Sequence, residues 1–350
     1  MKKILLSIVA LCCTVVAGAQ NSSQQQTAIL QKGDGTAEGS VTVYYGSDAL
    51  KEAYNAADEE GCVITLTSGQ FNFSMDIKKA IAIYGVGFED GLFEGVQKTT
   101  INGWVAFRAF ANGSNLKNAK LEGVYVNNSV YVNHCENLTI AKCQFSDLVF
   151  DGTDITGVLV RQCYISGSVN GKNNVIGGLT VKNCYFGGWV YDTANNSQMT
   201  FDHCIFVDGK YSHSNFPALY TNCIIQHNWG DNDNLTGLRY GSTAEKCIFA
   251  RGAFSSNVFS VDNWFGVDFS ALFADAANSS YAIDRTFKLA VPYNTYEGTD
   301  GTEIGINGGD YPWYKVPSIP YVKNLNATVN GTSLDVNYDA GVGSTNPPTE

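Results

Sequence analysis

The octapeptide Leu138-Thr-Ile-Ala-Lys-Cys143-Gln-Phe145 decides the fold, because related segments recur along the chain. Each copy contains a cysteine, one further residue and then a large apolar residue. The cysteines of the later copies are Cys163, Cys184, Cys204, Cys223 and Cys247, at successive intervals of 20, 21, 20, 19 and 24 residues. Weaker copies without cysteine precede them, at residues 121–126 and 100–105. A nearly fixed period of this length is the sequence signature of a repeat architecture.

The alternation inside each copy contains one extra residue. Leu138 and Ile140 are two positions apart and face one side of a strand, but Cys143 follows Ile140 by three positions. A one-residue bend in the left-handed conformation at Lys142 would turn Cys143 back to the inner side. The equivalent bend positions are Gln162, Asn183, His203, Asn222 and Lys246. Asparagine tolerates this conformation better than most residues, which supports the interpretation.

Short strands joined by a bend, with no helix between copies, predict an all-β solenoid. A βαβ sheet is excluded because its crossovers need a dozen or more residues of their own. Successive copies would pair through parallel ladders, so like residues would stack on like residues. We therefore expect an interior file of the six cysteines, flanked by a second apolar file. Its members are Phe145, Ile165, Phe186, Phe206, Ile225 and Phe249.

The two ends of the solenoid need covers. A helix is expected over residues 48–60, with Ser47 as its cap and Gly61 as its stop. Its apolar face would consist of Leu50, Ala53, Tyr54 and Ala57. Residues 62–66 and 77–84 read as the first rungs, and residues 322–329 and 334–338 as a C-terminal strand pair. The expected organisation is a signal peptide at 1–19, a flexible segment at 20–39, the capped solenoid at 40–320 and a short β tail at 321–350.

The first residues have the features of an export signal. Lys2 and Lys3 precede an apolar run at residues 4–16, and Ala17-Gly-Ala19 offers the small residues that a signal peptidase accepts. The run is too short for a membrane anchor, so no membrane insertion is expected. A lipid on Cys12 or Cys13 is the alternative. We expect the mature chain to be periplasmic, at the cell surface or extracellular.

Composition narrows the class of partner. The formal net charge is −11, and 16% of the residues are charged, against about 25% in typical domains. The negative balance makes nucleic acid a poor partner. The apolar fraction of 44% is enough for one sizeable core.

These segments resemble a known superfamily. The run Gly61-Cys-Val-Ile-Thr-Leu-Thr-Ser-Gly69, the repeated copies and the run at residues 301–313 are similar to right-handed parallel β-helix proteins of the pectin-lyase-like superfamily, especially exported members from Bacteroidetes. The resemblance covers roughly residues 40–320 and implies a right-handed parallel β-helix. It implies no single function, because the superfamily includes polysaccharide lyases, glycoside hydrolases and adhesins.

Eight cysteines follow the first nineteen residues. Neighbours on adjacent rungs would be close, but their Cβ vectors would point the same way, which suits disulfide geometry badly. We expect buried thiols that act as small apolar side chains. No paired CxxC motif occurs in the sequence, and no metal site or cofactor is expected, although calcium remains open.

Loops on the outside of the coil carry the candidate functional residues. Asp151, Asp192 and Asp231 each lie eight residues after a cysteine, on alternate rungs. Aromatic and basic residues cluster around them. Rings that stack on sugar faces, beside amides and carboxylates that bind hydroxyls, favour a glycan or polysaccharide ligand. The predicted ligand-binding residues are Trp189, Tyr191, Asp192, Tyr211, Trp229, Asp231 and Arg239.

Two other functions stay open. A polysaccharide lyase would need a base and a cation or arginine for the substrate carboxylate, and Lys210, Asp192 and Asp231 are the candidates. The paired-acid signatures of β-helix glycoside hydrolases are absent from the sequence, so binding without catalysis is favoured. The third possibility is a structural rod in a surface assembly, with a protein partner bound through the tail.

Overall fold

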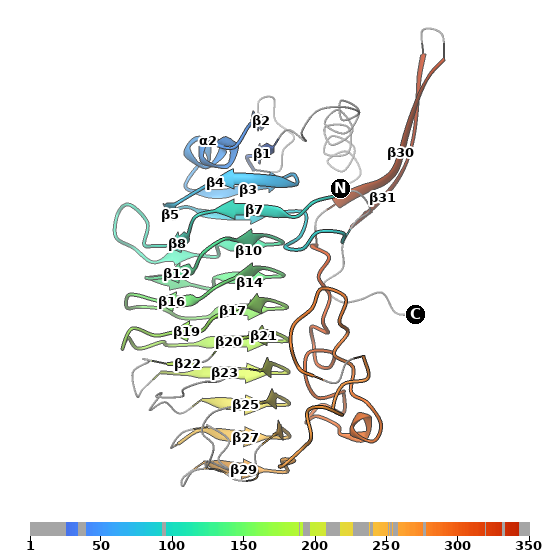
Figure 1. Ribbon diagram of the computed structural model, residues 1–350. Helices are drawn as coiled ribbons and strands as arrows, with labels where there is room; N and C mark the ends of the chain where they lie inside the picture. Colours follow the sequence, from blue (N-terminus) through green and yellow to red (C-terminus); the bar gives the residue numbers. More distant parts are fainter. Residues whose placement is uncertain are drawn as a thin grey trace.

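The computed structural model describes residues 26–33, 40–92, 96–188, 190–191, 197–207, 218–226, 238, 241–250, 252, 254, 258–275, 278–318, 320–330 and 333–342. In this part of the chain, short strands stack rung upon rung into a right-handed parallel β-helix (Figure 1). The coil has three faces, which we call sheets A, B and C. The all-β class and the solenoid architecture predicted from the repeat are therefore confirmed.

Each of the three sheets is a ladder of short neighbouring strands. In spatial order, sheet A contains β2 (Val41–Tyr45), β1 (Thr27–Gln31), β3 (Glu60–Leu66), β6 (Ala80–Tyr84), β10 (Lys120–Glu122), β14 (Thr139–Ala141), β17 (Val158–Arg161), β20 (Leu179–Lys182), β23 (Met199–Asp202), β25 (Leu219–Thr221), β27 (Thr243–Glu245) and β29 (Phe259–Val261). Sheet B contains β28 (Ile248–Phe249), β26 (Ile224–Ile225), β24 (Ile205–Phe206), β21 (Tyr185–Phe186), β18 (Tyr164–Ile165), β15 (Gln144–Phe145), β11 (Tyr125–Val126), β7 (Thr99–Asn102) and β4 (Gly69–Asn72). Sheet C contains β22 (Val190–Tyr191), β19 (Val169–Asn170), β16 (Leu148–Phe150), β12 (Val130–Val132), β8 (Val105–Phe107) and β5 (Met75–Ile77).

The corner between sheets A and B is the predicted bend. All six bend residues have φ between 50° and 54°, and they are Lys142, Gln162, Asn183, His203, Asn222 and Lys246. Each bend residue also donates its backbone N–H to a carbonyl of the next rung, as Asn183 does to Asp202 at 3.0 Å. The one-residue insertion in the repeat thus turns the chain from sheet A to sheet B while keeping the apolar residues inside.

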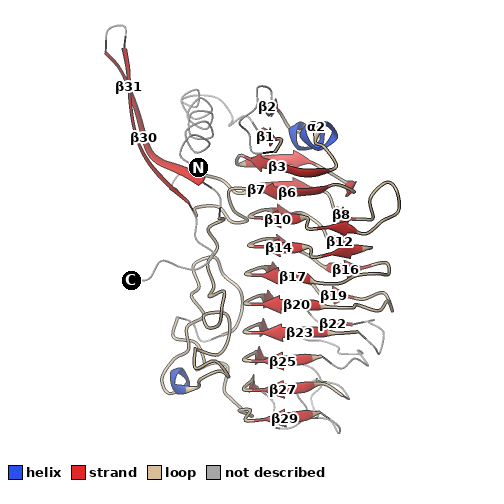
Figure 2. Ribbon diagram, turned by 180° about the vertical axis from the view of Figure 1, so that it is seen from behind, coloured by secondary structure: helices blue, strands red, loops and turns tan. Residues whose placement is uncertain are grey.

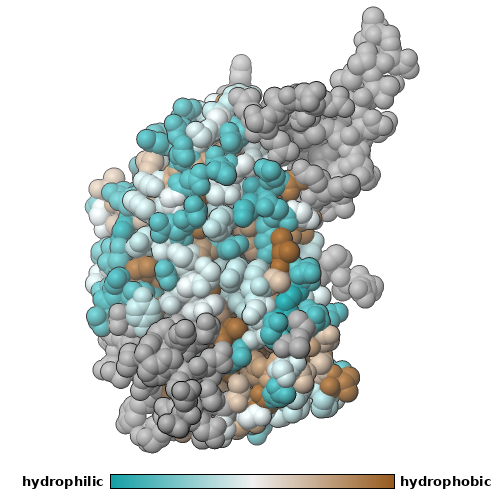
Figure 3. Space-filling model, in the orientation of Figure 1, coloured by the Kyte–Doolittle hydropathy of each residue, from teal (hydrophilic) through white to brown (hydrophobic). Residues whose placement is uncertain are grey.

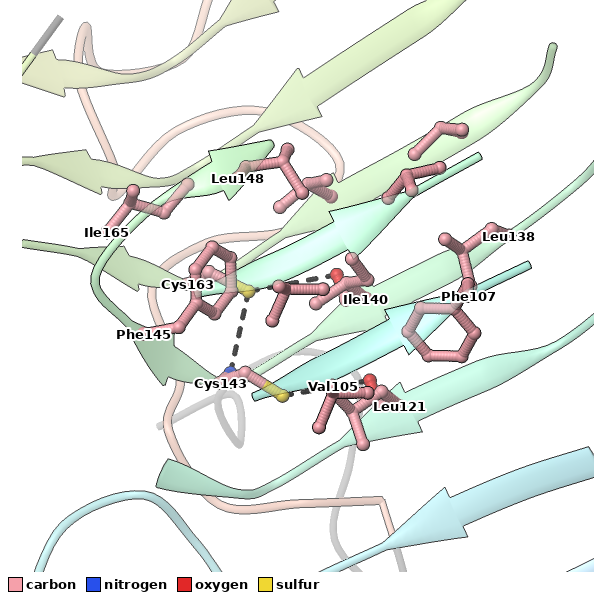
Figure 4. Packing of buried hydrophobic residues seen from close by; sticks show 14 of the residues in the cluster. Val105, Phe107, Leu121, Leu138, Ile140, Cys143, Phe145, Leu148, Cys163 and Ile165 are labelled. Carbon is pink, nitrogen blue, oxygen red and sulfur yellow. Dashed lines mark hydrogen bonds between the residues drawn. The ribbon is translucent and has the colours of Figure 1, made fainter. Parts of the chain in front are cut away.

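The interior is apolar and layered (Figure 4). The six repeat cysteines are fully buried, and the register pairs Phe145 with Ile165 and Ile165 with Phe186 as expected. The Sγ of Cys163 lies 3.5 Å from the backbone nitrogen of Cys143 and 3.7 Å from the carbonyl oxygen of Ile140. All eight cysteines of the described residues are free. Burial raises the pKa of the Cys143 and Cys163 thiols well above the usual range, so both remain neutral.

The N-terminal end is covered by a helix and two antiparallel strands. Helix α2 (Ala49–Ala56) buries the predicted apolar face of Leu50, Ala53, Tyr54 and Ala57. It ends at Ala56 rather than Glu60, because Ala57 is already extended and the Nζ of Lys79 binds the carbonyl oxygens of the last turn. Residues 20–39 were expected to be flexible, and this expectation is wrong for residues 27–31. They form β1, which is buried between β2 and β3.

Beyond β29 the chain turns back along the coil. Residues 267–318, which we call the return segment, run beside the coil toward its N-terminal end in both views (Figures 1 and 2). They include the short helix η1 (Tyr293–Thr295). The expected C-terminal strand pair is then present as the antiparallel hairpin β30 (Pro320–Asn330) and β31 (Ser333–Val342), which is longer than the sequence suggested. A small separate pair, β9 (Leu116–Lys117) and β13 (Cys135–Glu136), completes the strands.

The return segment is held by the corner between sheets A and B. On six successive rungs, one polar side chain hydrogen-bonds to it at 2.5–3.2 Å. The pairs are Glu122 with Ser318, Lys142 with Val316, Gln162 with Pro312, Asn183 with Ile306 and Gly308, His203 with Thr302, and Asn222 with Thr299. From the first pair to the last, the coil residue advances along the sequence from Glu122 to Asn222, while its partner in the return segment moves back from Ser318 to Thr299. The bend residues therefore set the register of the return segment on the coil.

A second apolar cluster lies under the return segment. It joins the outer face of sheet B to apolar residues of the return segment, including Leu272, Phe287 and Ile306. The contributions of sheet B are Tyr185, Ile205, Ile224 and Ile248, with Tyr164 packed against them. The C-terminal half of sheet B is therefore covered by the chain itself.

Candidate functional site

Of the seven predicted ligand-binding residues and the candidate base Lys210, Tyr191 alone lies within the described part of the chain. It ends β22, at the outer face of sheet C. The remaining candidates fall outside the described residues, and their roles stay predictions. They are Trp189, Asp192, Lys210, Tyr211, Trp229, Asp231 and Arg239.

The Tyr191 hydroxyl is held by an amide on the neighbouring rung. Asn170, which pairs with Tyr191 across β19 and β22, donates from Nδ2 to the tyrosine oxygen at 2.9 Å. The Oδ1 of Asn170 accepts the backbone N–H of Lys172 at 2.9 Å. Asn170 is only 5% exposed, whereas Tyr191 is half-buried. This pair is therefore a fixed polar group with an aromatic ring beside it.

The register of sheet C extends this pair into a file of outward residues. In order along the coil they are Asp76, Ala106, Tyr131, Val149, Asn170 and Tyr191. Tyr131 is half-buried and packs edge-on against Trp104, with ring centroids 6.1 Å apart. Tyr131 and Tyr191 are three rungs apart, or about 14 Å at the usual strand spacing. We call this file and Trp104 the sheet C face.

Trp104 and Tyr131 were not among the residues predicted from sequence. Both lie on early rungs that lack the repeat cysteine after the bend, so the offset used to align the loops has no starting point there. A usable signal was present, because Trp104 lies within the weak copy at residues 100–105 and Tyr131 lies between Val130 and Val132 in an alternating strand.

A charged cluster flanks the sheet C face. Arg108 binds Asp151 through Nη1 at 2.5 Å and approaches Asp76 through Nε at 3.5 Å. Burial opposes the charge of Arg108, but the hydrogen bond and charge of Asp151, together with Asp76, raise its pKa above the ordinary value. Asp151 was aligned with Asp192 and Asp231 as a groove carboxylate, and the structure instead pairs it with this guanidinium. Asp76 also lies 3.5 Å from the Nζ of Lys78, so each of the two carboxylates has a basic partner.

The remaining acids of this region also have partners. Asp147 accepts the backbone N–H of Ser168 at 2.8 Å, and Asp154 lies 3.2 Å from the Nδ1 of His134. Within the described ranges, no group of three or more His, Cys, Asp or Glu side chains is arranged to hold a metal ion. Asp147, Asp151 and Asp154 are therefore each engaged in hydrogen bonds or ion pairs within the protein.

The polarity of the surface differs along the coil. In Figure 3 hydrophilic residues dominate the upper part of the view, and apolar residues appear at the lower right, where Figure 1 places the return segment.

Among the residues that the structure describes, none of the helices is long and apolar enough to span a membrane. In comparisons with known proteins, the chain matches no protein-family model, no curated protein and no solved structure.

Proposed function

We propose that this protein binds a glycan chain along the sheet C face and does not cleave it. The observation that carries the proposal is the fixed Asn170–Tyr191 pair with the half-buried ring of Tyr131 three rungs away. Aromatic rings offer flat apolar surfaces to the faces of sugar rings, and the buried amide of Asn170 holds the Tyr191 ring in place. Rings and amide lie in one straight file, which suits an extended chain.

Binding is favoured over cleavage by the charges beside this face. A lyase or hydrolase needs a carboxylate or amine that is free to exchange a proton with the substrate. Asp76 and Asp151 instead lie in ion pairs with Arg108, at 3.5 and 2.5 Å. Proton transfer between either carboxylate and a substrate would have to compete with these ion pairs.

The cellular setting belongs to the same proposal. Lys2, Lys3 and the apolar run after them support export by a signal peptide, which would bring the protein to the periplasm or the cell surface, where polysaccharides occur. The repeat and the observed coil support kinship with the pectin-lyase-like superfamily. A protein partner at the β30–β31 hairpin remains an additional prediction.

A polysaccharide array tests the proposal. Tyr131→Ala and Tyr191→Ala should each weaken retention on the polysaccharide that binds the native protein, by about 3- to 10-fold, because each removes one stacking ring. Tyr84→Ala is the matched control, since Tyr84 is a half-buried ring on the outer face of sheet A. Absence of retention on every polysaccharide, or equal losses in the control, would contradict the proposal. Release of unsaturated or reducing-end products would show catalysis instead.

A further inference from the structure

A second concave site lies between sheet B and the return segment. Its volume is about 550 Å³, within the range of about 300–1,000 Å³ that is usual for small-molecule pockets. Its walls include the rings of Tyr164, Tyr185, Tyr281 and Phe269. The site is distinct from the sheet C face, because its aromatic residues come from the outer face of sheet B and from the loop at residues 269–281.

The aromatic walls are rigidly placed. The rings of Tyr164 and Tyr281 stack with centroids 3.9 Å apart and an interplanar angle of 16°. Tyr185 is 2% exposed, and its hydroxyl donates to the carbonyl oxygen of Ser279 at 2.6 Å. The Tyr281 hydroxyl donates to Glu89, whose carboxylate also binds Lys315 at 2.6 Å. These contacts fix the rings before any ligand arrives, which lowers the entropic cost of binding.

Several polar side chains of the pocket make fewer hydrogen bonds than they could. Gln226 accepts the Ser279 hydroxyl through Oε1, and Asn278 accepts the backbone N–H of Ser280 through Oδ1 at 3.0 Å. Within the described chain, the amide nitrogens of both residues and the hydroxyl of Tyr164 have no hydrogen-bond partner. These uncommitted donors line the same pocket as the rings.

We infer that this pocket binds one neutral sugar unit. Ring faces bind the apolar side of a sugar, and two amide groups with a phenol bind its hydroxyl oxygens. None of the described lining side chains is charged, and Arg285, which donates to the lining residue Asn278 at 3.2 Å, is buried and paired with Asp275 at 3.1 Å, so a uronate or phosphate would have no uncommitted counter-ion among these residues. The choice of a sugar rests partly on the proposed function, while the position and neutrality of the site rest on the pocket alone.

Ligand-observed NMR with the full chain tests this inference, with glucose, galactose, mannose and galacturonate as separate probes. At least one neutral hexose should show saturation transfer, and galacturonate should bind more weakly. Tyr164→Phe, which removes one hydroxyl and keeps the stacked ring, should weaken hexose binding by about 3- to 10-fold. Ser280→Trp, at an exposed position of the lining, should abolish it by filling the entrance.

Tyr125→Phe is the matched control, because Tyr125 lies on the same sheet face away from the pocket and its hydroxyl donates to Asn127. It should bind the hexose like the native protein. Absence of binding by all three hexoses, tighter binding of galacturonate, or full hexose binding by Ser280→Trp would each overturn the inference. Polysaccharide retention through Tyr131 and Tyr191 is measured separately and should survive Ser280→Trp, so the two proposals can fail independently.

Discussion

Sheets B and C are faces of the same coil, yet the chain treats them differently. On the C-terminal half of sheet B the outward positions are apolar, as in Ile205, Ile224 and Ile248, and the return segment covers them. On sheet C the outward file includes two half-buried tyrosines, Tyr131 and Tyr191, which are separated by the buried residues Val149 and Asn170. One outward residue per rung therefore decides whether a face is covered by the chain itself or remains available to a ligand.

The largest expected effect comes from releasing the return segment at Asn222. This residue is 2% exposed, has φ of 54°, and accepts the backbone N–H of Thr299 at 2.8 Å. Asn222→Val should lower the free energy of unfolding by about 4 kcal/mol, because it combines backbone strain with lost hydrogen bonds.

Asn222→Gly separates the two causes, since glycine adopts the bend freely and loses only the hydrogen bonds. Asn222→Gly should lower the free energy of unfolding by about 2 kcal/mol. Urea unfolding measures both variants. Equal losses would show that the left-handed bend imposes no strain on valine, which would contradict the role assigned to the bend.

A smaller effect is expected at Lys142, which donates to the carbonyl oxygen of Val316 at 2.6 Å. Burial lowers the pKa of Lys142 to about 8. In the unfolded chain the ammonium group of Lys142 keeps its proton up to pH about 10.4. Between pH 8 and 10.4 the unfolded state therefore binds more protons than the folded state, and the free energy of unfolding rises with pH. Relative to Lys142→Met, the native protein should gain roughly 3 kcal/mol between pH 8 and 10.4.

The comparison with Lys142→Met is needed because the buried cysteines act in the opposite direction. Burial raises the thiol pKa of residues such as Cys163, so their stabilisation is lost above the unfolded pKa of about 8.5 in both proteins. Urea midpoints at pH 7, 8, 9 and 10 measure the difference between the two proteins. A flat difference would mean that Lys142 carries an ordinary pKa.

The smallest expected effect is at the last contact of the return segment. The buried carboxylate of Glu122 accepts from Ser318 and binds Lys120 at 2.7 Å. Burial opposes its ionisation, but Lys120 and Ser318 prevail and lower its pKa. Its contribution is therefore complete above the unfolded pKa of about 4.3 and disappears as the pH falls below it.

Glu122→Gln should lower the free energy of unfolding by about 1 kcal/mol at pH 7 and by less at pH 3, because the stabilisation by the ionised carboxylate is lost as the pH falls below the unfolded pKa of about 4.3. Glu136→Gln, in which a more exposed carboxylate loses its ion pair with Lys117, is the matched control. A cost that is the same at both pH values would contradict the assignment.

The parts of the structure that repeat were predictable from sequence. The bend at Lys142 and the stacked cysteines follow from a nearly constant period, because equal offsets become physical neighbours in a solenoid. The path of the return segment could not be predicted from the repeat, because its contacts join residues more than seventy positions apart and do not themselves recur in the sequence. Tyr131 was missed because its rung lacks the repeat cysteine after the bend, and β1 was missed because a short strand at the end of a coil has no copy to compare with.

Hydroxyl-radical footprinting of tyrosine, with and without the polysaccharide selected on the array, is the sharpest test of glycan binding on sheet C. Binding along this face predicts protection of Tyr131 and Tyr191 by the glycan, with no change at Tyr84 on sheet A or Tyr125 on sheet B. Protection of Tyr84 or Tyr125, with unchanged oxidation of the two sheet C tyrosines, would contradict it.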